Sequence, residues 1–150
     1  MGYVDFTPFG ATALSDGNYV VLSPFWDNKI VVDVGAVTWG NGQVGATGDV
    51  SLTNSLRGAW AGDRIGYTDG NFGVVALKNG HYVVCSPRWD NGEIVDAGAA
   101  TWMNGGGVET GTISAANSMT GVQAEDNVAL DCVIALTNGH YVISSANWDN

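Results

Sequence analysis

The chain has 150 residues, of which 45% are hydrophobic, 13% are charged and 22 are glycine. This composition predicts one folded domain that turns often, and it excludes a disordered chain. The formal charge of -10 at pH 7 repels phosphate groups and anionic lipid, which excludes nucleic acid and membrane surfaces as partners.

A recurring motif is the strongest feature of the sequence. Trp26-Asp27-Asn28 returns as Trp89-Asp90-Asn91 and as Trp148-Asp149-Asn150, at spacings of 63 and 59 residues. With an offset of 63 and no gaps, residues 18–58 match residues 81–121 at 22 of 41 positions. Periods of this length are typical of tandem structural arrays.

The spacings divide the chain into unequal units. We predict a single repeat domain that spans residues 1–150. It consists of a half unit at 1–28 and two units at about 29–91 and 92–150. We place the shortening from 63 to 59 after Gly58, where Ala59–Asn71 corresponds to the briefer Val122–Asn127. This stretch is the predicted variable loop.

The first two strands of a unit form the clearest predicted hairpin. They run from Val74 to Leu77 and from His81 to Pro87, and Asn79-Gly80 joins them. Asp16-Gly17 and Asn138-Gly139 occupy the same place in the other copies. Asn-Gly and Asp-Gly between apolar strands favour a type I′ turn, because both central residues need positive φ.

Two further strands complete a predicted four-stranded antiparallel meander. The third spans Ile94–Trp102, a turn follows at Asn104-Gly105, and the fourth spans about Thr110–Ser114. No window has the apolar stripe of a helix for more than about a turn, and only Ser114–Met119 suits a short helical turn.

Repeated meanders of this period favour an all-β, β-propeller-like architecture, with a stacked β-solenoid as the alternative. Ten strands do not close a ring of four-stranded blades, and the end layers would keep uncovered faces and edges. We therefore expect the chain to bind itself, in a ring or in a filament, or to belong to a longer array. The surplus hairpin, at Met1–Asn28 or Val128–Asn150, is the predicted element of exchange.

The Trp-Asp-Asn motif has two interpretations. A tryptophan beside a carboxylate and an amide is typical of sugar sites, whereas a large aromatic at a strand end also packs between units and Asp-Asn is common in turns. Trp39 and Trp102 read as core, and Trp60 in the variable loop is a candidate for a separate contact. The candidate ligand-binding residues are Trp26, Asp27, Asn28, Trp60, Trp89, Asp90, Asn91, Trp148 and Asp149.

Calcium is a further hypothesis, because an oxygen-rich set recurs. The candidate ligands are Asp27, Asn28, Asp33, Asp90, Asn91 and Asp96. Carboxylate and amide oxygens suit this cation, but the spacing lacks the pattern of an EF-hand loop. The competing interpretation, in which Asp27 and Asp90 cap the turn, leads us to expect no cofactor.

The same duplication argues against catalysis. A glycosidic active site usually separates the roles of two carboxylates, whereas the aspartates here repeat in the same context. His81 and His140 follow the Asn-Gly turn where the first copy has Asn18, so we read them as hairpin residues. The sequence has no Gly-x-Ser-x-Gly elbow and no Walker loop. We predict that the chain is not an enzyme.

The compartment stays open at this stage. No apolar run approaches the roughly 20 residues of a membrane span, and no leader precedes Tyr3, which predicts a cytosolic chain or a leader outside these residues. Cys85 and Cys132 occupy different positions of the repeat, so we interpret both as small buried hydrophobes rather than as a disulfide framework.

Three strings, Asn18–Asn28, Asp33–Gly42 and Ser51–Ser55, resemble a repeat found in tandem in large bacterial surface proteins of filamentous-haemagglutinin type. The resemblance covers nearly the whole chain, with departures at Lys29-Ile30 and at Ala146, where glycine and proline are usual. It implies β-propeller-like arrays in an extracellular or cell-surface setting.

Two functions follow from these observations. The first is a non-catalytic repeat module for self-assembly and for adhesion or scaffolding, which completes its fold by homo-oligomerisation. The alternative is a lectin-like carbohydrate-binding module with one site per repeat and a glycan as its partner.

Overall fold

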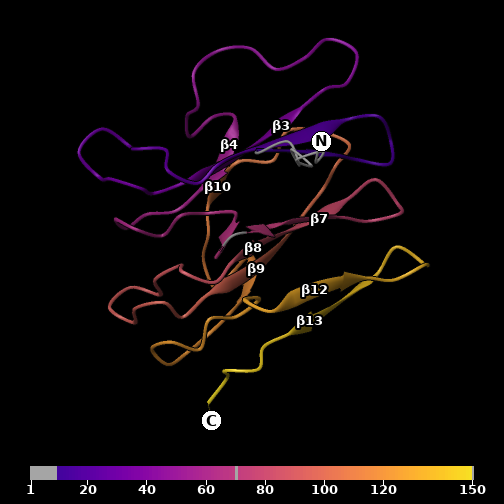
Figure 1. Ribbon diagram of the computed structural model, residues 1–150. Helices are drawn as coiled ribbons and strands as arrows, with labels where there is room; N and C mark the ends of the chain where they lie inside the picture. Colours follow the sequence, from indigo (N-terminus) through magenta and orange to yellow (C-terminus); the bar gives the residue numbers. More distant parts are fainter. Residues whose placement is uncertain (1–9, 70, 150) are drawn as a thin grey trace, which may run out of the picture.

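The computed structural model describes residues 10–69 and 71–149, and these form an all-β protein (Figure 1). The sheets lie in three stacked layers that follow one another along the chain. They make an open row rather than a closed ring (Figure 1). Within the described ranges, no helix is long and apolar enough to cross a bilayer.

The strands of the first two layers pair as antiparallel meanders, and the third layer is a hairpin. The first layer has β1 (Ala11–Ala13), β2 (Tyr19–Ser23), β3 (Ala36–Gly40) and β4 (Ser55–Arg57). The second has β7 (Val74–Ala76), β8 (Tyr82–Ser86), β9 (Ala99–Met103) and β11 (Ser118–Thr120). The third has β12 (Cys132–Ala135) and β13 (Tyr141–Ser144). This pairing confirms the predicted meander and its Asn79-Gly80 hairpin.

The pairing groups the half unit at the C-terminal end, whereas the predicted division put it at 1–28. A repeat can be cut at any phase, so this division stays a prediction. Residues 1–9 of the predicted half unit, and part of the Met1–Asn28 exchange element, lie outside the described residues.

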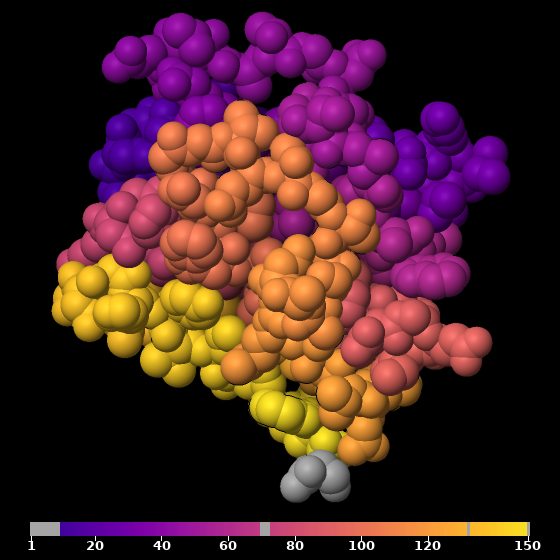
Figure 2. All heavy atoms as spheres, turned by 180° about the vertical axis from the view of Figure 1, so that it is seen from behind, coloured from indigo at the N-terminus to yellow at the C-terminus, as the bar shows by residue number. Residues whose placement is uncertain are grey.

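The fourth strand was predicted in the wrong place. Residues 110–114 contain β10 (Gly111–Thr112), but this strand crosses to the first layer and pairs in parallel with β4. From behind, the segment between β9 and β11 runs across the first two layers (Figure 2). The extended conformation was therefore predicted correctly, but the partner strand lies in the neighbouring layer.

Two local expectations are also corrected. The third strand begins at Ala99 rather than at Ile94, because Asn91 and Ile94 exchange backbone hydrogen bonds of 2.9 and 3.2 Å and close a tight loop. Ser114–Met119 forms a single turn, in which the N–H of Asn117 donates to the carbonyl of Ser114 at 3.1 Å, and it then enters β11 rather than a helix. Asn117 Oδ1 accepts the N–H of Ser114 at 2.9 Å, and such side-chain bonds favour turns over helix.

The shortening between copies also lies later than predicted. Asp63 and Asp126 accept equivalent backbone hydrogen bonds, so the ungapped offset of 63 continues beyond Gly58. The extra residues of the first unit form a small hairpin of β5 (Tyr67–Thr68) and β6 (Asn71–Phe72). Trp60 therefore has a counterpart, Gln123, which the sequence alignment missed.

Apolar side chains hold the layers together face to face. We call the face of a layer toward the preceding layer its front, and the opposite face its back. Val20 and Leu22 on the back of the first layer pack in one cluster with Tyr82 and Val84 on the front of the second. Side chains alternate along a strand, so β2 is buried on one face and β8 on both.

The second interface repeats this arrangement. Val83 and Cys85 on the back of the second layer pack with Val133, Tyr141 and Ile143 of the third. Each fully buried valine contributes about 1.5–3 kcal/mol to stability. Cys85 is 3% exposed, as predicted for a small buried hydrophobe, whereas the side chain of Cys132 lies outside the described residues.

A glycine just before the third strand allows a close backbone approach in each of the first two units. Gly35 and Gly98 both have φ of 76°, a left-handed conformation that favours glycine. A Cβ on Gly35 would lie 2.2 Å from the nitrogen of Ile65, and one on Gly98 would lie 2.2 Å from that of Val128. No side chain fits at either position.

We expect Gly98→Ala to lower the free energy of unfolding by about 3–4 kcal/mol, because backbone strain adds to a clash with main-chain atoms. Gly92→Ala is the matched control, since φ there is 68° but nothing lies within 4 Å of a new Cβ. It should cost about 1–2 kcal/mol. Urea unfolding measures both, and equal losses would contradict the close approach.

Candidate functional site at the Trp-Asp-Asn loop edge

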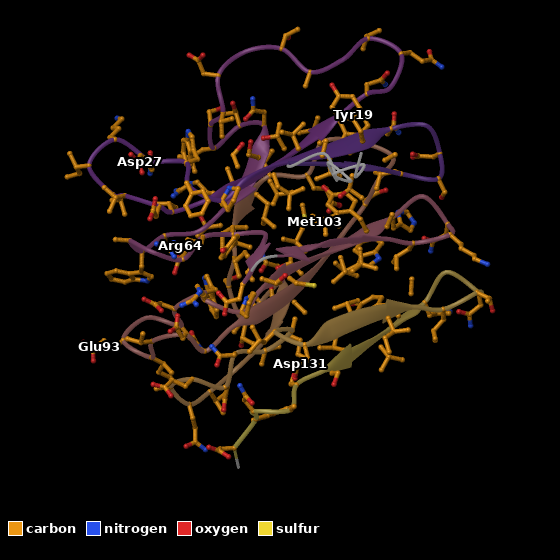
Figure 3. The ribbon with its side chains drawn as sticks, in the orientation of Figure 1. Tyr19, Asp27, Arg64, Glu93, Met103 and Asp131 are labelled. Carbon is orange, nitrogen blue, oxygen red and sulfur yellow. The ribbon has the colours of Figure 1, made fainter. Side chains whose placement is uncertain are left out.

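The Trp-Asp-Asn turns lie on one edge of the stack, which we call the loop edge. It consists of residues 24–34, 58–69, 87–97 and 121–130. Asp27, Arg64 and Glu93 lie one above another along it (Figure 3). The loop edge gathers most of the candidate residues, so its geometry decides what they can do.

In the first two Trp-Asp-Asn motifs, the aspartate closes its own loop. Asp27 Oδ1 accepts the N–H of Asp33 at 2.8 Å, and Asp90 Oδ1 accepts the N–H of Asp96 at 2.8 Å. Asp33 and Asp96 have φ of 51° and 52°, so these bonds hold a strained backbone. This is the turn-capping role that the sequence suggested for Asp27 and Asp90.

A second, buried aspartate joins consecutive units, and the sequence analysis missed it. Asp63 Oδ2 accepts the N–H groups of Ala59 and Trp60 at 2.7 and 2.8 Å, while Oδ1 accepts the N–H of Asp90 in the next unit at 3.0 Å. The side chain is fully buried, at 0% exposure. Asp63 therefore ties the Trp-Asp-Asn turn of the second unit to the loop of the first.

The second unit repeats this arrangement, which we call the aspartate clasp. Asp126 Oδ2 accepts from Val122 and Gln123 at 2.8 and 2.9 Å, and Oδ1 accepts from Asp149 at 3.2 Å. Extending the ungapped alignment beyond Gly58 would have paired Asp63 with Asp126 and exposed the signal.

The two clasps differ in electrostatics. Burial raises the pKa of Asp63 above its usual value, although three N–H donors act against this rise. The N–H donors of Gln123, Val122 and Asp149 lower the pKa of Asp126. The difference follows from position, because Asp63 lies between two complete units and Asp126 between a complete unit and a hairpin.

The tryptophans of the motif have unequal environments. Trp89 is 4% exposed within the core between the first two layers, so its indole has no open face for a sugar ring. Trp26 is half-buried, and Trp148 is 52% exposed. The same motif thus packs or faces solvent according to its neighbours.

Three of the six calcium candidates already use a side-chain oxygen in a protein contact, namely Asp27, Asp33 and Asp90. Arg64 donates to Asp33 Oδ2 at 3.0 Å, and Asn91 Nδ2 donates to the carbonyl of Gly121 at 3.2 Å. Burial raises the pKa of Asp96. In the described part of the chain, no three His, Cys, Asp or Glu side chains gather closely enough to hold a metal ion.

The exposed positions of the loop edge differ most between copies. The first unit exposes apolar side chains here, with Phe25 at 55%, Ile30 at 94% and Trp60 at 53%. The equivalent residues of the second unit are Arg88, Glu93 and Gln123. The centroid of the Phe25 ring lies 5.5 Å from that of Tyr67 and 5.4 Å from Cζ of the Arg64 guanidinium. The framework recurs while the solvent-facing side chains change.

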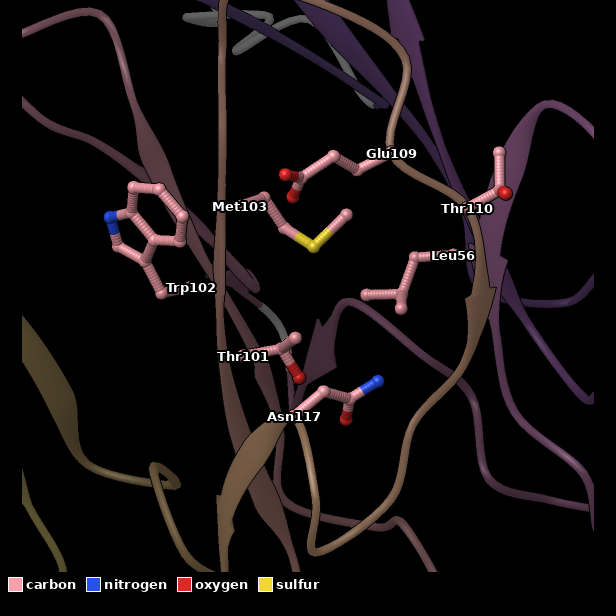
Figure 4. Close-up of a pocket in the computed structure, with 7 residues that line it drawn as sticks. All are labelled: Leu56, Thr101, Trp102, Met103, Glu109, Thr110 and Asn117. Atoms are coloured by element: carbon pink, nitrogen blue, oxygen red, sulfur yellow. The ribbon is translucent and has the colours of Figure 1, made fainter.

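A pocket of about 300 Å³ lies where the chain leaves β9 for the first layer (Figure 4). Its lining residues are Leu56, Thr101, Trp102, Met103, Glu109, Thr110 and Asn117. It presents a single carboxylate, and Glu109 Oε2 accepts the N–H of Asn104 at 3.0 Å. That bond positions the crossing segment.

A family model described as "Repeat of unknown function (DUF5650)" matches residues 13–67, 76–130 and 135–150. The chain belongs to this repeat family. The first two DUF5650 matches have the same length and the same offset of 63 as the structural units, which confirms the tandem repeat. No curated protein and no solved structure matches the chain. The DUF5650 match carries no filamentous-haemagglutinin identity, so that resemblance stays a proposal.

We expect Asp63→Asn to lower the free energy of unfolding by about 1–3 kcal/mol, because the amide turns an N–H donor toward a buried N–H. Asp49→Asn is the matched control, since Asp49 is exposed and the substitution removes the same charge. Urea unfolding at pH 7 compares them, and equal effects would show that the clasp adds nothing.

The two clasps should also respond to pH with opposite signs. A lowered pKa makes Asp126 stabilising above the unfolded pKa of 3.8, and this contribution is lost as pH falls through the native pKa. The raised pKa of Asp63 makes its contribution greatest below 3.8, and this is lost as pH rises. The stability gap between wild type and Asp126→Asn should therefore shrink between pH 7 and 3, while the gap for Asp63→Asn widens. Slopes of the same sign would contradict the assignment.

Proposed function

We propose that this chain is a non-catalytic repeat module that self-associates head to tail, with the back of its third layer against the front of another copy's first layer. The observation that supports this is the exposure of equivalent residues. Val20 and Val83 are 0% exposed between layers, whereas Val142 at the same position of the third layer is 48% exposed.

A leucine shows the same pattern. Leu14 and Leu77 are 5% and 1% exposed, and their counterpart Leu136 is 37% exposed. Ile134, at 52%, lies beside Val142 on β12 and extends the surface. This back face has the chemistry that each preceding layer buries against its neighbour.

The occupant that fits the back face is the front of a second copy. Tyr19 and Val21 are half-buried on the front of the first layer. The equivalent residues are Tyr82 and Val84 on the front of the second layer, and Tyr141 and Ile143 on the front of the third. A front therefore meets a back twice within one chain already. Such head-to-tail contacts build rings or filaments.

Adhesion or scaffolding at a cell surface belongs to the same proposal and is supported by the surface-protein resemblance of the motif strings. The division of the loop edge into constant framework and changing exposed residues suits a scaffold that displays loops. The absence of catalysis is supported by the clasp, which uses its carboxylates to accept backbone N–H groups.

Light scattering coupled to size exclusion tests the association. The wild type should show a multiple of 15.6 kDa that grows with concentration, and Leu136→Asp should shift it to the monomer because a charge cannot be buried in the interface. Leu52→Asp is the matched control, at a leucine 50% exposed in a loop, and should not change the mass. A wild-type monomer at all concentrations would overturn the proposal.

A second candidate function is glycan binding by the loop edge of the first unit, supported by two exposed aromatic side chains, Trp60 and Phe25, the latter with the Arg64 guanidinium over its ring. Because Trp89 is buried, this site would serve one unit rather than every repeat. Saturable changes in tryptophan fluorescence with a glycan, lost in Trp60→Ala and kept in Trp148→Ala, would support it. No response across a glycan panel would exclude it.

A further inference from the structure

The chain has five Asn-Gly pairs, and all of them lie in turns. Asparagine followed by glycine loses its side-chain amide more readily than other asparagines do, because glycine has no Cβ to shield its nitrogen from the neighbouring side chain. Which pair reacts in the folded protein depends on what holds each glycine nitrogen. The five pairs are Asn41-Gly42, Asn79-Gly80, Asn91-Gly92, Asn104-Gly105 and Asn138-Gly139.

Four of the five glycine N–H groups are held by hydrogen bonds. A bonded N–H keeps its proton and directs its nitrogen toward the acceptor rather than toward the asparagine side chain. The four bonds run from Gly42 to Asn18 Oδ1 at 3.1 Å, from Gly105 to His81 Nδ1 at 3.3 Å, and from Gly80 and Gly139 to the carbonyls of Leu77 and Leu136 at 3.2 Å each.

Gly92, on the loop edge of the second unit, is the exception. Within the described ranges no acceptor takes its N–H, and nothing lies within 4 Å of a Cβ built on this exposed residue. Asn91 and Ile94 close the turn around it by backbone hydrogen bonds of 2.9 and 3.2 Å. The Gly92 nitrogen is therefore open to attack Asn91.

The equivalent turn of the first unit has a different residue at this point. Asn28 and Val31 close it by backbone hydrogen bonds of 3.0 and 3.1 Å, but Lys29 replaces the glycine, at φ of 60° against 68° for Gly92. The lysine Cβ crowds the nitrogen that would have to attack Asn28. The chain thus contains an open turn and a hindered turn of similar backbone conformation.

We propose that Asn91 is a site of spontaneous deamidation, independent of self-association. The Gly92 nitrogen gives its proton to hydroxide and attacks Cγ of Asn91. The N–Cγ bond forms, the Cγ–Nδ2 bond breaks, and the amide nitrogen takes a proton from water and leaves as ammonia. Water then opens the succinimide ring at Cγ, which gives aspartate, or at the main-chain carbonyl, which gives isoaspartate.

The product loses a contact that the amide makes. Asn91 Nδ2 donates to the carbonyl of Gly121 at 3.2 Å, whereas an ionised carboxylate only accepts, so two acceptors would face each other. In the first unit the carbonyl of Gly58 accepts from Arg57 at 2.9 Å instead. Deamidation at Asn91 therefore loosens the loop edge of the second unit.

Peptide mapping by mass spectrometry, after incubation of the full chain at mildly alkaline pH, tests the proposal. Asn91 should convert to the acid at least about tenfold faster than the asparagine of any other Asn-Gly pair, and its product should contain isoaspartate. The chain unfolded in guanidinium chloride is the control, because all five pairs should then convert at comparable rates. Faster conversion at another pair of the folded chain, or none at Asn91, would overturn the proposal.

Exchange of the turn residue between the units tests the role of the open nitrogen. Gly92→Lys should stop conversion at Asn91, and Lys29→Gly should start it at Asn28, because φ at both positions is positive and close in value. An unchanged rate at Asn91, or an Asn28 that keeps its amide in Lys29→Gly, would contradict that role.

Asn91→Asp imitates one product and tests the consequence. Its midpoint of urea unfolding should fall below that of Asn28→Asp, the matched control, which makes the same change of charge in the equivalent turn. In the described residues the Asn28 amide makes no bond to Gly58. Equal midpoints for the two variants would show that deamidation does not loosen the loop.

Discussion

Front-to-back contact between layers is the interaction on which the structure depends. A single four-stranded layer buries only one of its faces, as β2 shows, whereas β8 between two layers is buried throughout. A thin antiparallel sheet without a covered face is marginally stable in water. The apolar clusters between layers therefore stabilise each meander as well as joining it to the next.

The aspartate clasp adds direction to this non-directional contact. Apolar surfaces can slide over one another, but Asp63 requires three N–H donors from two units at fixed positions. A buried carboxylate without these donors would be costly, so the clasp sets the register between units. The Trp-Asp-Asn motif, which resembles a ligand site in isolation, is in this fold the part that receives the clasp.

Position in the stack then divides constant from variable residues. Residues that recur between copies, such as Gly35 and Gly98, hold the loops against the strands. Residues that differ, such as Trp60 and Gln123, face solvent on the loop edge. The framework of the units can thus stay the same while the side chains exposed on the loop edge differ.

Much of the fold could be predicted from the sequence because it depends on local chemistry. The period of the motif, the all-β class and the hairpin at Asn79-Gly80 follow from spacing, alternation and turn preference within short windows. The capping role of Asp90 belongs to the same class, since its partner Asp96 is six residues away. These features need no knowledge of the next layer.

Tertiary structure alone decided the rest, because it depends on which layer lies alongside. β10 was recognisable as extended, but only the stack placed it beside β4. Trp89 and Trp148 carry the same motif, yet Trp89 is buried in the cluster between the first two layers whereas Trp148 is exposed. The sequence by itself determined the repeat and its turns, whereas burial and the clasp arise from packing between units.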